Sequence, residues 1–136
     1  MAQITNEMVE AAYNIGKKVY QEELIQEEGV DILYSKYGMG SGSAKGYIHN
    51  YICMINGEQY TRTINEYATK YYLTRILLDN GEKSFVCALD ALRKHLKYQD
   101  SIGHNTMSNI KKIYSTFFKI KNNNYSSIVS KVFELF

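Results

Sequence analysis

Residues 43–55, SAKGYIHNYICMI, decide how this chain folds. Their apolar and aromatic side chains recur three and four positions apart, which is the spacing of one helix face and not the alternation of a strand. Gly57 follows directly, and glycine is the residue type that most readily ends a helix. The stretch therefore predicts an amphipathic helix that begins near Ser43, with an apolar face made of Ala44, Tyr47, Ile48, Tyr51, Ile52 and Ile55.

A second helix is expected immediately before this one, over about residues 26–37. Val30, Leu33 and Tyr37 share one face of it, and Gly38 stands where a left-handed residue ends a helix. The Gly- and Ser-rich residues that follow leave room only for a tight turn. A helix, a tight turn and an amphipathic helix in this order are typical of the helix-turn-helix, so residues 28–56 are predicted to form such a unit.

The rest of the sequence repeats the helical spacing. Thr5 or Asn6 can cap a first helix, and further helices are expected over about residues 83–99 and 106–121. Thr63 and Glu66 form the pattern of a capping box at the start of another helix, which is apolar almost all round and ends at Asn80. Residues 122–136 are expected to add a short C-terminal helical extension. Proline is absent, so we predict one all-α domain over residues 1–136, a compact bundle of five to seven helices.

The composition excludes several classes of protein. Hydrophobic residues make up 45% of the 136 residues and charged residues 22%, as in an ordinary globular domain. No apolar run reaches the roughly 18–20 residues that cross a bilayer, and the N-terminus lacks a secretory signal pattern. Cys53 and Cys87 are expected to be free thiols in a cytoplasmic protein. Because no catalytic, phosphate-cradling or metal-ligand motif is present, we expect no enzyme, no cofactor and no metal site.

Charge is divided unevenly along the chain. Residues 1–68 hold nine acids and five bases, a balance of −4, whereas residues 69–136 hold five acids and eleven bases, a balance of +6. The two halves give the net charge of +2. A basic half of this kind indicates contact with nucleic acid. The alternative is two solvated faces of opposite sign that help the halves of the chain to dock.

The predicted helix-turn-helix suggests a DNA-reading surface. In that motif the second helix enters the major groove and its amino-terminal polar residues face the base edges. Ser43, Lys45, His49 and Asn50 are expected on the side of the helix away from the core. Asn can bond adenine, Lys can reach guanine or phosphate, and a helix amino terminus suits a phosphate. The alternative is an ordinary helix hairpin, whose outer face must be polar in any case.

A second basic stretch follows, in which Arg62, Lys70 and Arg75 alternate with tyrosines. Cations interleaved with aromatic rings are the composition that holds phosphates and stacks bases. Tyr is equally suited to the edge of a core, where the ring packs and the hydroxyl reaches water. We therefore assign most of these tyrosines to the core and the three cations to phosphate contacts.

Residues 36–73, KYGMGSGSAKGYIHNYICMINGEQYTRTINEYATKYYL, also carry a family resemblance. Together with NEMVEAAYNIGKKVY at 6–20, they resemble a domain at the N-terminus of bacterial HNH-endonuclease and McrA-like restriction proteins, over residues 6 to about 98. The resemblance implies recognition of duplex DNA. No HNH module follows in this sequence, so we do not carry over cleavage and expect a non-enzymatic nucleic-acid-binding module.

Two other functions fit the same sequence. The first is a small phage or mobile-element protein that binds and inhibits a bacterial defence nuclease, as anti-CRISPR and anti-restriction proteins do. Its contact residues would be exposed tyrosines, with Tyr34, Tyr60, Tyr72 and Tyr98 as candidates. The second is a homodimer formed through a C-terminal aromatic patch around Phe117, Phe118, Phe133 and Phe136.

Overall fold

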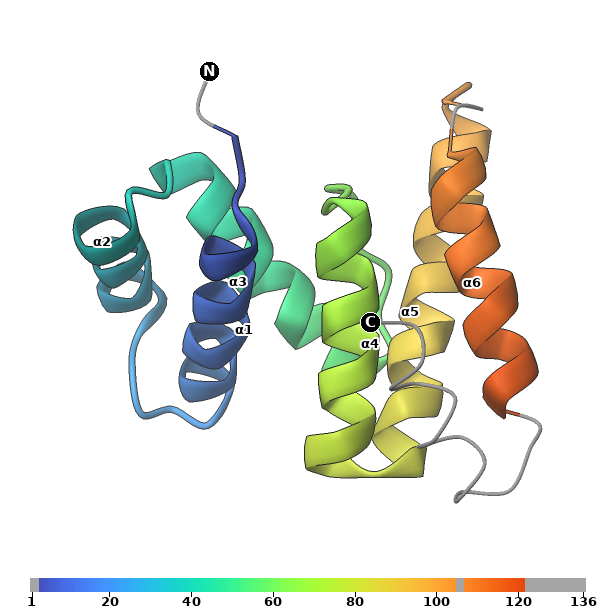
Figure 1. Cartoon of the computed structure of the whole chain (residues 1–136), viewed down its shortest axis with the longest axis horizontal. Coiled ribbons are helices and arrows are strands. Elements are labelled where there is room, and N and C mark those ends of the chain that lie inside the picture. The colour runs from blue at the N-terminus through green and yellow to red at the C-terminus, as the bar shows by residue number, and fades with distance from the viewer. Residues whose placement is uncertain (1–2, 105–106, 122–136) are drawn as a thin grey trace.

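The computed structural model describes residues 3–104 and 107–121, and over these residues the chain is an all-α bundle without strands. The fold class predicted from the sequence is therefore confirmed (Figure 1). Predicted helices over residues 122–136, and the contacts of Phe133 and Phe136, lie outside the described residues. The helices of the described part are α1 (Asn6–Tyr20), α2 (Gln26–Tyr37), α3 (Ser41–Asn56), α4 (Glu66–Asn80), α5 (Glu82–Ser101) and α6 (Ser108–Lys121).

The helices form a row rather than a ring. Helix α4 contacts α1 on one side and both α5 and α6 on the other, as its largely apolar surface predicts. Helix α2 lies at the outer edge and packs on α1 and α3 (Figure 1). Helix α3 crosses behind this row and joins α1 and α2 to α5. The amino ends of α3 and α4 lie toward the same edge of the molecule, which the site described below uses.

Helices α2 and α3 meet at a three-residue turn. Gly38 ends α2 in the left-handed conformation at φ 73°, as its sequence position predicts. Met39 then turns inward and is fully buried, and Gly40 caps α3 through its backbone alone. Helix α3 begins at Ser41, slightly before the position expected from its apolar spacing, because the turn needs no more than these three residues.

The start of α4 differs from the sequence prediction. Asn65 is the capping residue, and its side chain accepts a hydrogen bond of 2.8 Å from the backbone N–H of Ala68. The predicted capping box of Thr63 and Glu66 is wrong, because the Thr63 hydroxyl lies 2.8 Å from Nε2 of His95 instead. Residues 57–65 therefore form an extended connection between α3 and α4, held against α5.

Three tyrosines pack together at the centre of the bundle. Tyr13 from α1, Tyr51 from α3 and Tyr72 from α4 pack edge to face, with ring centres 5.1–6.3 Å apart. The Tyr72 hydroxyl donates a hydrogen bond of 3.2 Å to the carbonyl of Tyr47, so burial leaves no unmet polar group there. Gly16 lets α1 approach α3 closely, since a Cβ at that position would lie 2.9 Å from Cβ of Tyr51.

Candidate nucleic-acid interface

The connection between α3 and α4 is fixed by side chains from α5. Lys94 Nζ donates to the Gly57 carbonyl at 2.7 Å, and Gln99 Nε2 donates to the Thr61 carbonyl at 3.2 Å. Between them, His95 Nδ1 lies 2.7 Å from the Tyr60 carbonyl, which can only accept, so Nδ1 carries the proton. His95 is 1% exposed, and burial lowers its pKa although the bond to Tyr60 opposes this. His95 is therefore part of the buried core, where it supports residues 57–65.

Helix α3 holds the same connection from the other side. Asn50 Nδ2 donates a hydrogen bond of 2.8 Å to the Arg62 carbonyl, and the Tyr47 hydroxyl accepts one of 3.2 Å from the Asn65 N–H. Asn50 is completely buried. The prediction that Asn50 faces a DNA groove is therefore wrong. Asn50 lies on the side of α3 that packs against residues 60–65, and the spacing of residues within α3 gives no information about that neighbouring segment.

Arg62 lies across the first turns of α3. Its guanidinium donates to the Ser43 hydroxyl at 3.0 Å and to the Gly42 carbonyl at 3.4 Å. Gly46 makes this approach possible, because a Cβ there would lie 2.2 Å from Cδ of Arg62 and 2.8 Å from Nε. Ser43 and Arg62, predicted separately, are thus brought into contact, and Gly46 is a residue that the sequence analysis missed.

The charge of Arg62 is not paired with a carboxylate within the described residues. The protein has three arginines; Arg75 pairs with Asp79 and Arg93 with Asp90, whereas Arg62 has no carboxylate partner among the residues described. The first turn of α3 contains no acidic residue, and its capping residue contributes no side-chain acceptor. The positive end of the helix dipole therefore adds to the charge of Arg62 instead of being neutralised.

Lys45 and His49 are exposed and share one face of α3, since they are four residues apart. His49 also lies against the thiol of Cys53, with Nε2 3.3 Å from Sγ. A groove of about 430 Å³ between α2 and α3 is lined by Ser41, Gly42 and Lys45 on α3 and by Glu27 and Asp31 on α2. A polyanion could therefore approach the amino end of α3 from the side of Arg62 and His49, but not through this groove.

The other two predicted phosphate contacts lie elsewhere. Lys70 lines a groove of about 250 Å³ between α4 and α6, together with Lys112. Arg75 is bonded to Asp79 at 2.5 Å, and Asp79 also accepts from the Tyr13 hydroxyl at 2.8 Å and from Lys17 at 3.3 Å. The structure does not bring Arg75 to the site at α3.

The tyrosines proposed as protein contacts have different fates. Tyr34 is 63% exposed on α2, and Tyr98 is half-buried on α5. Tyr60 and Tyr72 are 1% and 0% exposed, so the prediction that they are exposed is wrong. Tyr60 stacks on His95 with ring centres 4.4 Å apart, and burial raises the pKa of both tyrosines.

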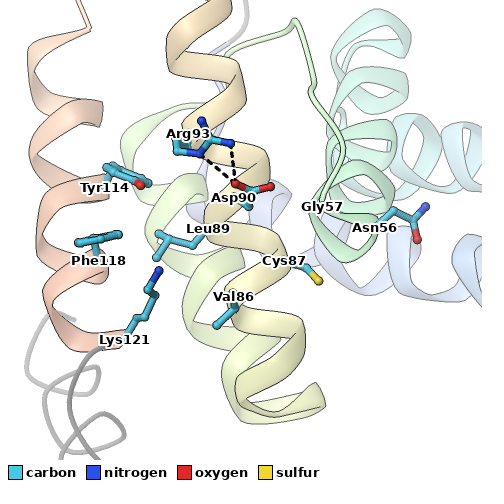
Figure 2. Close-up of a pocket in the computed structure, with 10 residues that line it drawn as sticks. All are labelled: Asn56, Gly57, Val86, Cys87, Leu89, Asp90, Arg93, Tyr114, Phe118 and Lys121. Carbon is cyan, nitrogen blue, oxygen red and sulfur yellow. Dashed lines mark hydrogen bonds and ion pairs between the residues drawn. The ribbon is translucent and has the colours of Figure 1, made fainter.

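A separate, largely apolar groove of about 390 Å³ lies between α5 and α6 (Figure 2). Val86 and Phe118 are exposed at 40% and 39%, and Lys121 lies 4.4 Å from the centre of the Phe118 ring. Phe117, which was predicted to contribute to an exposed aromatic patch, is instead buried in the core. Of that patch, the described residues leave Phe118 at the surface.

Three further results bear on the function. Within residues 3–104 and 107–121, no group of three or more His, Cys, Asp or Glu side chains could hold a metal ion. No helix in the same ranges is long and apolar enough to cross a membrane. No known protein family matches the chain, and no curated protein or solved structure is significantly similar to it.

Proposed function

We propose that this protein is a non-enzymatic DNA-binding module that uses the amino end of α3 and Arg62. The observation that carries the proposal is Arg62 itself: an arginine without a carboxylate partner in the described part of the chain, held across the start of a helix that has no side-chain cap. Arginine side chains and helix amino termini are among the groups that contact DNA phosphates.

The arrangement suggests an orientation on duplex DNA. Arg62 and the first turn of α3 would contact a phosphate, while Lys45 and His49 would face the base edges of the major groove. The carboxylates of Glu27 and Asp31 would exclude the backbone from the opposite side.

The experiment is a fluorescence anisotropy titration of a short labelled duplex with the purified protein, from low to physiological salt. Each phosphate contact releases counterions, so we expect log K to fall with log salt by about 0.9 per contact. A single-stranded oligonucleotide of the same sequence is the matched control. Absence of binding at low salt, or an affinity that does not change with salt, would refute the proposal.

The groove between α5 and α6 favours a second function, inhibition of a bacterial defence nuclease. Its exposed Val86 and Phe118 are suited to an apolar element of a protein partner. The test is loss of cleavage when the protein is added to a purified candidate nuclease, with Phe118→Asp as the variant expected to relieve inhibition. Stoichiometric capture of the nuclease, without DNA binding by the isolated protein, would replace the first function with this one.

A further inference from the structure

Residues 60–65 have no helix or strand of their own, yet their polar groups are bonded in almost unbroken succession. The carbonyls of Tyr60, Thr61 and Arg62 accept from His95, Gln99 and Asn50 at 2.7, 3.2 and 2.8 Å. The Thr63 hydroxyl meets the second nitrogen of His95, and the Asn65 N–H bonds Tyr47. A connecting segment ordinarily gives these bonds to water, because it runs over the surface.

The bonds come from two helices that approach the segment from opposite sides. Asn50 and Tyr47 belong to α3, whereas His95 and Gln99 belong to α5. Asn50 is the most specific of them: it is completely buried, its Nδ2 reaches one carbonyl only, and its Oδ1 has no partner among the described residues. A buried amide is tolerated only when it is hydrogen-bonded, so the bond to the Arg62 carbonyl is what offsets the burial of Asn50.

The group fixed by Asn50 is the backbone of Arg62, and the Arg62 side chain leaves this backbone to cross Gly46. A long, exposed arginine otherwise samples many rotamers, and ordering it on binding costs free energy. A backbone held from both sides, with a guanidinium already bonded to Ser43, removes part of that cost before a ligand arrives.

We propose that Asn50, His95 and Gln99 are positioning residues, which clamp residues 60–62 so that Arg62 is preorganised against the first turn of α3 to bind a phosphate. The inference rests on the proposed DNA-binding function for its ligand, but the clamp itself is a property of the protein alone. None of the three side chains touches the ligand; each acts through the Arg62 backbone or the residues next to it.

The decisive variant is Asn50→Leu, which keeps the branched shape of the side chain and removes its donor. We expect about a fivefold loss of affinity for the duplex with the salt dependence unchanged, because Arg62 still reaches the phosphate but must be ordered on binding. In an Arg62→Ala background the same substitution should change affinity no further, because its route of action is gone. Asn14→Leu, the same change at an exposed position of α1, is the control for non-specific effects. Equal losses in both backgrounds would overturn the proposal.

A second measurement needs no DNA and separates this inference from the proposed function. Backbone order parameters of residues 60–65 should fall in Asn50→Leu while those of α1 stay unchanged. If residues 60–65 lose order in Asn50→Leu but the native protein does not bind DNA, the clamp is supported and the proposed DNA-binding function is refuted. Unchanged order in residues 60–65 would refute the clamp, whatever the affinity for DNA.

If Asn50→Leu does not fold, His95 provides the same test. His95→Asn keeps a donor near the position of Nδ1, whereas His95→Leu removes it. We expect His95→Asn to retain more of both the order of residues 60–65 and the DNA affinity than His95→Leu. Equal behaviour of the two variants would overturn the role given to His95.

Discussion

Arg62 and Arg75 come from one Tyr-rich stretch of sequence, but their surroundings in the structure are opposite. Arg75 pairs within α4 with Asp79, and Asp79 also accepts from Lys17 and the Tyr13 hydroxyl of α1, so the charge of Arg75 is already paired. Arg62 bonds only a hydroxyl and a carbonyl among the described residues, and its charge is left uncompensated. The comparison teaches that the number of basic residues on a surface matters less than which of them already have a counter-ion.

The largest effect on stability is expected from removing Asp79, the carboxylate that pairs with Arg75 and Lys17. The Asp79 side chain is 16% exposed and accepts three bonds, which hold its pKa low although burial acts to raise it. Asp79→Ala should lower the free energy of unfolding by about 2 kcal/mol, because the Tyr13 hydroxyl and two cations lose their acceptor. Urea denaturation measures this.

Asp90→Ala is the matched control, because Asp90 pairs with Arg93 and Lys94 on the surface of α5 and is 41% exposed. We expect a loss of no more than about 0.5 kcal/mol there. A similar loss in both variants would show that burial of Asp79 makes no difference.

The next effect compares the two arginines directly. Arg62→Ala should weaken binding of the duplex about tenfold and lower its salt dependence by about one phosphate contact. Arg75→Ala should leave the affinity within about twofold, because its charge is already paired. Anisotropy titrations at several salt concentrations measure both variants. Equal losses would mean that the two regions bind DNA alike.

The local rules of helix formation explain how much of the fold could be predicted. Helix α3 was predicted from its apolar spacing, and the helix ends at Gly38 and Gly57 from the preference of glycine for the left-handed conformation. The all-α fold was predicted in part from the absence of proline. These signals depend only on nearby residues, and the structure agrees with each prediction. Thr63 failed as a cap because a histidine far along the chain competes for its hydroxyl. Capping patterns compare a residue only with its neighbours in sequence, and they cannot include such a partner.

The site was predictable only in part, for the same physical reason. Ser43, Lys45, His49 and Arg62 lie near one another, but Asn50 is buried by a segment that returns from beyond the end of α3. Whether an arginine is paired depends on the position of acids on other helices. One signal was available: Gly46, in the middle of an otherwise good helix, indicates a close approach by another part of the chain.

Gly46 allows Arg62 to be displaced without being removed. In Gly46→Ala the new Cβ would lie 2.2 Å from Cδ of Arg62, so the arginine must leave α3. We expect about a fivefold loss of DNA affinity. The stability of the protein should change little, because the roughly 1 kcal/mol by which alanine favours a helix over glycine offsets the contacts that Arg62 loses.

Gly42→Ala is the control for this variant, since a Cβ at Gly42 meets no atom within 4 Å. It should gain stability and keep its affinity. Retained affinity in Gly46→Ala would show that contact between Arg62 and α3 is unimportant for binding.

Stability should also depend on pH through the clamp that holds Arg62. Burial lowers the pKa of His95, so the unfolded chain takes up a proton more readily than the folded one. The contribution of His95 to stability is therefore complete above about pH 6.5 and is lost as the pH falls from there toward the folded pKa. Urea denaturation across this range should show a weaker pH dependence for His95→Asn than for the native protein. The same dependence of stability on pH in the native protein and in His95→Asn would contradict the role given to His95.

The smallest effect on DNA affinity is expected from the acidic residues near the start of α3. Glu27 and Asp31 line the groove beside Lys45 and should repel a DNA backbone that approaches the start of α3. The double variant Glu27→Gln, Asp31→Asn should therefore bind the duplex about two- to threefold more tightly at low salt, with the difference shrinking as salt is added. Glu22→Gln, Glu23→Gln removes the same charge from the loop between α1 and α2, which does not line this groove, and should have less effect. A gain that is the same in both double variants would mean that net charge, and not the position of the two acids, governs binding.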